Sequence, residues 1–327
     1  MLPPPCKASP RLAFLLGVLL ALGGCAQLPG APESPAPPGF RTLVLPGRDG
    51  ATLQALERGA RVAPLRYRVV VVPGSGCAGM GAFAGRYFAG LLHAQVLVLH
   101  KPGVDPQART APGDCASGFV QQDRLSAWLA HARAALQADA LRRQGEPPVP
   151  QLLVGISEGA ELLPALGPEV PQLAGLVLIG SSGLDPQQAG ALQAERLGAQ
   201  AAWAALGRIQ ASRWADSAVV QGRSLGYWRD LWSWPLALPL VRSPWPLLQV
   251  WGGDDALVPA AAYAHFAHLA ARRTVPYCAR RIGGADHGLQ RPDGSDGVQQ
   301  VWAWVEQWAR APQAGLCGPG VSAADAS

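Results

Sequence analysis

The chain has 327 residues, of which 49% are hydrophobic and only 15% are charged, and it is long enough for one large α/β domain or two small ones. This composition excludes an intrinsically disordered chain. The formal net charge is +5, but the arginines are scattered and form no basic stripe with interleaved aromatic residues. Nucleic acid is therefore not an expected partner.

The first 24 residues have the pattern of an export signal peptide. Lys7 and Arg11 supply a basic start, and residues 12–22 form an apolar run that is too short for a stable membrane anchor. The residues that follow are rich in Pro, Ala and Gly, which is typical of an extended tether. The expected division is a signal peptide over 1–24, a lipidated cysteine and tether over 25–39, a folded domain over 40–312 and a tail over 313–327.

The signal ends at a motif that resembles one in a known class of proteins. Leu22-Gly23-Gly24-Cys25 is similar to the lipobox of bacterial lipoproteins, in which a peptidase cuts before the cysteine and acyl chains such as palmitate are attached to it. The resemblance implies that Cys25 anchors the chain to a membrane. Ala26 after it favours the outer membrane, facing the periplasm. The alternative is an ordinary signal peptide in which Cys25 has no such role.

A series of short apolar segments predicts a β-sheet. The domain opens with two alternating runs around a Pro-Gly-Arg-Asp-Gly turn in residues 41–58, a pattern typical of a hairpin. The later runs are continuous and rich in β-branched residues, as expected for parallel strands buried on both faces. They cover residues 66–76, 94–103, 151–157, 173–183, 246–255 and, more weakly, 277–287.

Helical patterns lie between these strands. They cover residues 123–143, 260–273 and 297–311, whereas residues 113–122 fit either a loop or a helix start. Strand and helix therefore alternate after the opening hairpin. This alternation predicts an α/β fold with a mostly parallel central sheet and helices on both faces.

A long insertion over residues 184–245 separates two of the predicted strands. Its pattern is helical, and a structureless loop of this length is rare in a compact domain, so we expect a small helical cap. Most of its tryptophans are expected to pack the cap onto the body, and one or two to line a pocket. They are six of the chain's eleven: Trp203, Trp214, Trp228, Trp232, Trp234 and Trp245.

The segment Gly155-Ile156-Ser157-Glu158-Gly159 fits the Gly-x-Ser-x-Gly pattern of a nucleophile elbow. It follows a predicted buried strand and precedes a helical pattern, which is the context that such a turn needs. Side chains at the two glycine positions would collide with the neighbouring strand and helix. We predict that Ser157 is a nucleophile, with an ordinary turn serine as the alternative. The acids Glu158 and Glu161 are expected to be exposed at the helix start, with a part in substrate choice as the alternative.

A serine nucleophile needs a base that is oriented by a third group. Of six histidines, only His287 stands downstream of Ser157 in a loop after a predicted strand; His265 and His268 are expected on a helix surface. For the acid, Gly252-x-x-Asp255-x-x-Val258-Pro259 resembles the acid turn of the α/β-hydrolase superfamily and selects Asp255 over Asp254. Asp254 and Asp286 are expected to be turn residues.

The resemblance to the α/β-hydrolase superfamily covers about residues 41–312 and implies its fold. It also implies that Ser157, His287 and Asp255 form a catalytic triad, with an oxyanion hole made of backbone N–H groups. One donor would be the N–H of Glu158. The other would come from the loop over residues 72–77, which is similar to the superfamily's His-Gly-x-Gly loop. Ser75 is the expected donor there and Gly76 the alternative, although Pro73 stands where the superfamily has histidine.

Four cysteines lie in the expected mature domain, and an even number in an oxidising compartment predicts disulfides with three possible pairings. The fold that the resemblance implies favours Cys77–Cys115, which would fasten the oxyanion loop, and Cys278–Cys317, which flank the last strand–helix unit. Free buried thiols are the alternative. No Cys-x-x-Cys motif or His/Cys cluster predicts a metal site, and no cofactor is expected.

The resemblance implies a serine hydrolase that cleaves a small-molecule or lipid ester, as a carboxylesterase or lipase does, through an acyl-enzyme. Two alternatives stay open. A peptidase or amidase of the same fold would need acids to meet a substrate amine, and the insertion holds few, among them Glu195, Asp216 and Asp230. A catalytically inactive envelope lipoprotein is the other, against which the complete set of nucleophile, base and acid argues.

Overall fold

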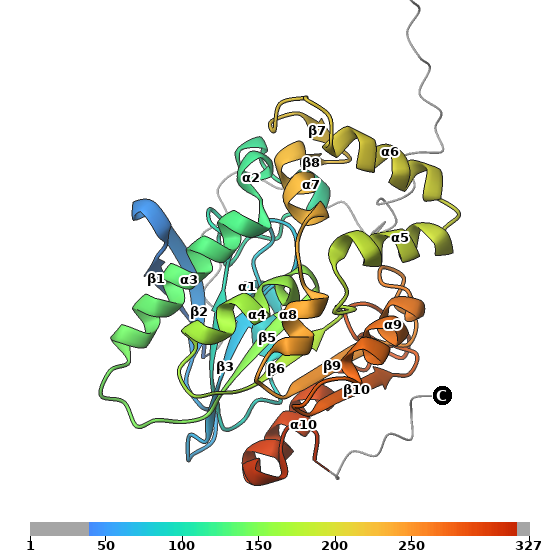
Figure 1. The fold of residues 1–327 in the computed structure, drawn as a ribbon. Coiled ribbons are helices and arrows are strands. Elements are labelled where there is room, and N and C mark those ends of the chain that lie inside the picture. Colours follow the sequence, from blue (N-terminus) through green and yellow to red (C-terminus); the bar gives the residue numbers. More distant parts are fainter. Residues whose placement is uncertain (1–38, 319–327) are drawn as a thin grey trace, which may run out of the picture.

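The computed structural model describes residues 39–318 and contains an eight-stranded sheet in the order β1-β2-β4-β3-β5-β6-β9-β10 (Figure 1). The strands β1 and β2 form an antiparallel hairpin, β2 is antiparallel to β4, and the other neighbours are parallel. The predicted fold class is therefore confirmed. The strands are β1 (Arg41–Pro46), β2 (Thr52–Arg58), β3 (Tyr67–Val72), β4 (Ala94–Leu99), β5 (Gln151–Ile156), β6 (Leu173–Ile179), β9 (Leu247–Gly252) and β10 (Tyr277–Ile282).

Two hydrophobic cores lie on the two faces of this sheet. Along β3, Val69 and Val71 point into one core, whereas Val70 and Val72 point into the other. This alternation is why an uninterrupted run of valines suits a central parallel strand. The first core is covered by α1 (Gly81–Tyr87) and α10 (Val298–Arg310), and the second by α3 (Leu125–Arg142), α4 (Leu163–Leu166), α8 (Ala237–Arg242) and α9 (Ala260–Ala270).

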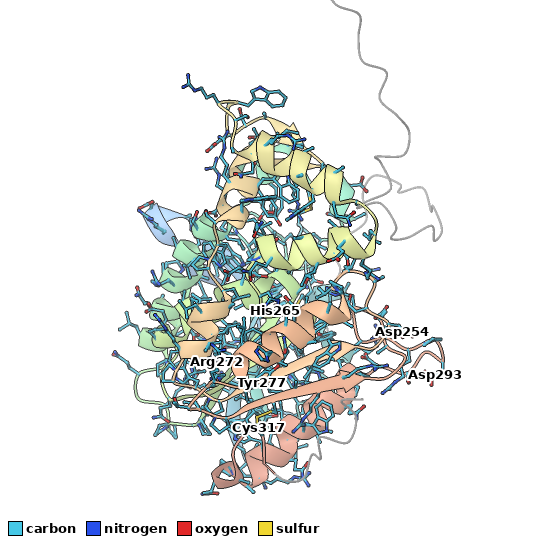
Figure 2. All side chains as sticks on the ribbon, turned by 45° about the vertical axis from the view of Figure 1, so that its right-hand side comes forward. Asp254, His265, Arg272, Tyr277, Asp293 and Cys317 are labelled. Carbon is cyan, nitrogen blue, oxygen red and sulfur yellow. A yellow bond between two sulfur atoms is a disulfide. The ribbon has the colours of Figure 1, made fainter. Side chains whose placement is uncertain are left out.

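Helix α9 shows how these helices divide between core and solvent. Tyr263 and Phe266 are buried against the body. His265 and His268 are exposed, as expected from the sequence, and Figure 2 labels His265 on this helix. The segment that the sequence left undecided is partly helical, because α2 spans Ser117–Gln122.

The insertion between β6 and β9 is helical, as its pattern predicts. It contains α5 (Pro186–Arg196), α6 (Gln200–Gln210), a hairpin of β7 (Val219–Val220) and β8 (Arg223–Ser224), α7 (Leu225–Trp232) and α8. In Figure 1, α5, α6, α7 and the hairpin stand above the sheet, while α8 returns to its face. Leu206, Leu225, Tyr227 and Trp228 form a small separate core in the insertion, and Trp203 and Trp232 pack against it.

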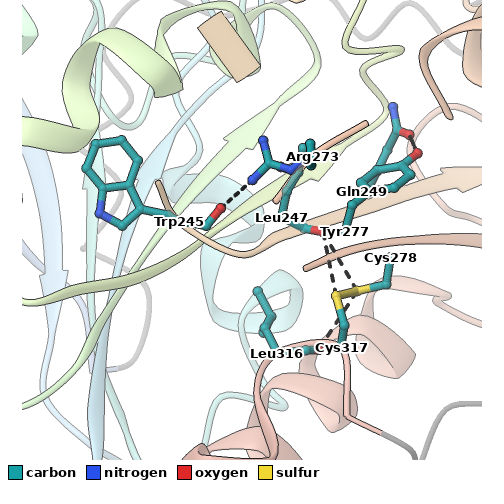
Figure 3. Close-up of a disulfide and its surroundings, with 8 residues drawn as sticks. All are labelled: Trp245, Leu247, Gln249, Arg273, Tyr277, Cys278, Leu316 and Cys317. Carbon is teal, nitrogen blue, oxygen red and sulfur yellow. Dashed lines mark hydrogen bonds between the residues drawn. A yellow bond between two sulfur atoms is a disulfide. The ribbon is translucent and has the colours of Figure 1, made fainter. Parts of the chain in front are cut away.

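Two disulfides fasten the loops of the body, in the pairing that the resemblance implies. Cys77–Cys115 joins the loop after β3 to the segment before α2. Cys278–Cys317 joins β10 to the segment after α10, beside Leu247 of β9 (Figure 3). The predicted signal peptide, Cys25 and almost all of the tether lie outside the described residues. Within residues 39–318, no helix is long and apolar enough to cross a membrane.

Candidate active site

The segment that the sequence predicts to be a nucleophile elbow has the backbone that such a turn needs. Ser157 has a φ of 51°, which is unusual for a residue with a side chain, at the junction of β5 and a 3-10 helix over Ser157–Leu162. A Cβ atom on Gly155 would lie 2.4 Å from Cα of Ala160, and one on Gly159 would lie 2.1 Å from the carbonyl oxygen of Val72. Both glycines are therefore required by close packing around the turn.

The three predicted triad residues come together from three loops at the carboxyl ends of strands. Nε2 of His287 lies 3.0 Å from Oγ of Ser157, and Nδ1 of His287 lies 2.9 Å from Oδ2 of Asp255. The loops are packed closely, since a Cβ on Gly252 would lie 2.1 Å from the carbonyl oxygen of Asp286. Both distances are those of hydrogen bonds, so the His287 imidazole connects the Ser157 hydroxyl with the Asp255 carboxylate.

Asp255 is held by four hydrogen-bond donors. Its Oδ1 accepts from the backbone N–H groups of Leu257 at 2.8 Å and Val258 at 2.9 Å, and its Oδ2 accepts from the Tyr263 hydroxyl at 3.1 Å as well as from His287. Burial raises the pKa of Asp255, but the hydrogen bond and charge of His287 together with the two backbone N–H groups outweigh burial and lower it. The carboxylate is therefore kept ionised and fixed in position.

The neighbouring acids have the local roles expected of them. Asp254 is exposed on the loop after β9 (Figure 2), whereas the Asp255 side chain is only 2% exposed. Oδ1 of Asp286 accepts a hydrogen bond from the backbone N–H of Gln290 at 2.8 Å, which closes a turn. The geometry thus brings Asp255, and neither of these neighbours, to His287.

The expected oxyanion loop adjoins Ser157. A Cβ on Gly74 would lie 3.2 Å from both Cβ of Ser157 and the carbonyl oxygen of Ile156, so the chain at residues 73–76 passes against the elbow. The loop is tied to the segment before α2 by the Cys77–Cys115 bridge. Gly76 has a φ of 95°, a conformation that favours glycine. The expected donors Ser75 and Gly76 therefore lie in a loop that is fixed beside Ser157.

The expectation that Glu158 is an exposed helix-start acid is wrong. Its side chain is buried and bonded to the Nζ of Lys101, and its Oε2 accepts a hydrogen bond from the Tyr227 hydroxyl at 2.6 Å. Lys101 also donates to Asp123 at 2.6 Å, and Arg223 pairs with Asp123 as well. Burial raises the pKa of Glu158, but the charges of Lys101 and Arg223 lower it by more, so that the net shift is downward. The carboxylate is therefore ionised.

This buried cluster of Lys101, Asp123, Glu158, Arg223 and Tyr227 links three parts of the fold. It joins the end of β4, the elbow and the helical insertion. Sequence reasoning missed it, although a lysine that directly follows a predicted buried strand is a signal for a site at that edge. Tyr263 was missed too, because a tyrosine on an amphipathic helix gives no such signal.

Glu161 also differs from the expectation of an exposed acid. Its Oε2 is buried and has no hydrogen-bond partner among the described residues. Burial, with the nearby charges of Glu158 and Asp185, raises the pKa of Glu161 well above its usual range. This environment disfavours the ionised form of the carboxyl, which lies near the elbow. No group of three or more His, Cys, Asp or Glu side chains within residues 39–318 is placed to hold a metal ion.

The comparisons with known proteins bear on the fold. No protein-family model and no curated protein matches the sequence. Among solved structures, the chain is similar to a puromycin-hydrolyzing peptidase of Mycobacterium tuberculosis, with 16% identity, a TM-score of 0.54, 85% of this chain covered and only 40% of that one. It is similar to the esterase domain of a Rhodothermus marinus protein, with 20% identity, a TM-score of 0.51 and coverage of 83% and 98%.

A third similar structure is carboxyl esterase 2 of the fungus Tuber melanosporum, with 16% identity, a TM-score of 0.55 and coverage of 84% of this chain and 88% of that one. The sheet order, the strand directions and these similarities define the α/β-hydrolase fold. One fold of this kind carries many activities, so the chemistry has to be argued from the site itself.

Proposed function

We propose that the protein is a serine hydrolase of carboxylic esters and that Ser157, His287 and Asp255 are its catalytic residues. The observation that carries this proposal is the continuous line of hydrogen bonds from the Ser157 hydroxyl through the His287 imidazole to the Asp255 carboxylate, at 3.0 and 2.9 Å. The left-handed backbone of Ser157 supports it, since such strain is found where a nucleophile has to be presented.

The geometry implies an acyl-enzyme mechanism. Nε2 of His287 takes the proton of Ser157 while Oγ forms a bond to the ester carbonyl carbon. Asp255 holds the imidazole in the tautomer that accepts this proton and stabilises the imidazolium. The tetrahedral intermediate collapses as its bond to the alcohol oxygen breaks, and the alcohol leaves with the proton from His287. Water then attacks the acyl-enzyme in the same way and releases the acid.

The negative oxygen of each tetrahedral intermediate needs fixed donors. We propose the backbone N–H groups of Glu158 and Ser75, with Gly76 in place of Ser75 as the alternative. The buried ion pair of Glu158 with Lys101 supports the first, because it fixes the residue whose N–H follows the nucleophile. The helical insertion acts in this proposal as a cap, since Tyr227 of α7 reaches the same glutamate.

An ester is favoured over a peptide because the acids of the insertion are engaged or turned outward. Asp216 is paired with Arg124 and Arg229, and Asp230 accepts a hydrogen bond from the backbone N–H of Ser126. Asp185 accepts hydrogen bonds from the backbone N–H groups of Leu236 and Ala237. Glu195 is exposed. The second candidate is a peptidase or amidase. It is favoured by the carboxyl of Glu161, whose buried Oε2 has no hydrogen-bond partner among the described residues and which would ionise if a substrate ammonium group came to lie beside it.

A substrate panel divides these two candidates. We expect the protein to hydrolyse p-nitrophenyl esters and to cleave aminoacyl naphthylamides at least a hundredfold more slowly. Cleavage of the naphthylamides with the higher kcat/KM would instead make the protein a peptidase. The variant Glu161→Gln sharpens the comparison: it should leave ester hydrolysis within a factor of about three, whereas a peptidase that uses Glu161 would lose activity on free-amine substrates.

We also propose that the chain is exported and anchored to the outer membrane through Cys25, facing the periplasm. The support is the Leu22-Gly23-Gly24-Cys25 motif, together with two disulfides of a kind that persist in oxidising compartments. Expression in a bacterium fed an alkyne analogue of palmitate should label the wild type and not the Cys25→Ser variant. Equal labelling of both would refute the anchor.

A further inference from the structure

A groove of about 370 Å³ lies beside the edge strand β10, and the end of β9 and helix α9 also line it. Helix α9 contributes Ala260, Ala264 and Ala267, which share one face of the helix because they are spaced by about one turn. Strand β9 contributes Trp251, and β10 contributes Ala279. The small side chains of the helix leave the space open, and the lining is mostly apolar.

This groove adjoins the candidate triad without containing its nucleophile or its base. Asp255 and Tyr263 line the groove, whereas Ser157 and His287 do not. The Asp255 side chain is only 2% exposed, and its two oxygens already accept four hydrogen bonds. The carboxylate therefore has no oxygen left for a ligand, and the groove is a different place from the one where an ester would meet Ser157.

Arg281 of β10 gives the groove a positive charge. It lies opposite Trp251 in the parallel register of β9 and β10, so both side chains leave the sheet on the same face. Its neighbour Arg280 points to the other face, where its guanidinium lies 4.3 Å from the ring centroid of Trp304. Arg281 is exposed, and its guanidinium has no hydrogen bond or ion pair with any residue between 39 and 318. A Cβ on Gly253 would lie 2.8 Å from Nε of Arg281, so glycine there leaves room for this side chain.

We propose that the groove binds an organic carboxylate with an apolar body, at a site that the hydrolysis of an ester does not use. A guanidinium forms paired, charge-assisted hydrogen bonds with a carboxylate. One guanidinium balances one negative charge, which favours a carboxylate over a more highly charged phosphate monoester. Asp255 does not offset this attraction with a free oxygen, because its hydrogen bonds occupy it.

The walls define the size and shape of the ligand. At about 30 Å³ for a group of the size of a water molecule, 370 Å³ has room for roughly twelve such groups. The Trp251 ring stacks on Tyr263, with ring centroids 4.6 Å apart and an interplanar angle of 12°, so this wall is fixed before a ligand binds. An aromatic wall beside small alanines suits a flat apolar body. The ligand class is therefore short arylalkanoates, of which 4-phenylbutyrate is a test compound.

The charge is tested by titration calorimetry with 4-phenylbutyrate and the uncharged 4-phenylbutyramide. The wild type should bind the acid about tenfold more tightly than the amide, because only the acid forms charge-assisted hydrogen bonds. Arg281→Gln should abolish this preference. The control Arg272→Gln should keep it, since Arg272 is an exposed arginine after α9 that does not line the groove (Figure 2). Equal binding of acid and amide by the wild type, or a preference that survives in Arg281→Gln, would overturn the proposal.

The place of binding is tested by filling the groove from the helix. Ala264→Phe should weaken the binding of both compounds at least tenfold, because Ala264 lines the groove. Ala261→Phe is the control, at an exposed position of α9 that does not line it, and should bind as the wild type does. Binding that is insensitive to Ala264→Phe would place the acid elsewhere and refute the groove. A dimeric wild type that Ala264→Phe makes monomeric in sedimentation would show that a second copy covers the groove, and would refute it too.

The same titrations separate this site from the proposed function. Ser157→Ala should bind 4-phenylbutyrate with the affinity of the wild type, because Ser157 does not line the groove. If the wild type hydrolyses no ester but the pattern over the Arg281 and Ala264 variants is seen, the ester hydrolase fails and the groove stands. If esters are hydrolysed but neither variant changes binding, the groove proposal fails and the hydrolase stands.

Discussion

Removing the hydroxyl of Tyr263 tests whether activity depends on the hydrogen bond that this hydroxyl donates to the candidate acid, Asp255. This hydroxyl donates to Oδ2 of Asp255 at 3.1 Å, the same oxygen that accepts from His287, while the Tyr263 ring stacks on Trp251 at 4.6 Å with an interplanar angle of 12°. Tyr263→Phe keeps the stacked ring and deletes one of four donors to the carboxylate. Tyr263 is thus a positioning residue that acts through Asp255.

The size of the effect follows from that contact. A hydrogen bond to a charged group contributes about 1.5–3 kcal/mol, and the 3.1 Å length of this one places it at the lower end. A loss of roughly 1.4 kcal/mol in the transition state lowers kcat about tenfold. We expect that loss in kcat with KM unchanged, measured on a p-nitrophenyl ester, because the hydroxyl touches the acid and not the substrate.

The control is Tyr277→Phe, which removes a hydroxyl bonded to Gln249 at 2.6 Å without touching the triad. It should leave kcat within a factor of two. The reasoning would be refuted if Tyr263→Phe kept the wild-type kcat, or if both variants lost kcat to the same degree. A thermal unfolding curve of each variant would show whether a lost hydroxyl acts only through stability.

Three further predictions concern the acid turn and the buried charges. Asp255→Asn should lower kcat about 10⁴-fold while Asp254→Asn changes it less than twofold, and equal effects would contradict the assigned acid. Lys101→Met should lower the free energy of unfolding in urea by about 3–5 kcal/mol because it removes the ammonium group that is bonded to the buried carboxylates of both Glu158 and Asp123. Hydrogen bonds and charges of Arg142 and Arg41 outweigh burial and lower the pKa of Glu57 from 4.5. The stability that ionised Glu57 contributes is therefore full above about pH 4.5 and is lost as the pH falls from there through the lowered pKa. The difference in the free energy of unfolding between the wild type and Glu57→Gln should shrink over the same range.

The order of the chain explains why the sequence points to the three residues that the structure brings together. Ser157, Asp255 and His287 each follow a strand whose apolar pattern is visible in the sequence, and parallel strands bring their carboxyl ends to one edge. The glycines on either side of Ser157 mark the turn itself, because packing leaves no room there for a Cβ. Strand pattern, turn chemistry and chain order therefore point to the same three residues.

The charged cluster could not be predicted in the same way. Glu158 is buried because Lys101, 57 residues earlier in the chain, supplies a countercharge and because Tyr227 of the insertion covers it. Such pairings depend on how the loops and the insertion fold over the sheet, which local patterns do not encode. The return of α8 to the face of the sheet is a similar case, since its apolar pattern fits packing against either the insertion or the body.

The central claim is that Ser157 is a nucleophile activated by His287. Reaction with a fluorophosphonate probe tests it most directly, because the probe forms a covalent bond with an activated serine. We predict that the wild-type protein is labelled, that the adduct maps by mass spectrometry to the peptide containing Ser157, and that Ser157→Ala is not labelled. A wild-type protein that resists the probe, or a Ser157→Ala variant that is labelled as fast as the wild type, would contradict the account.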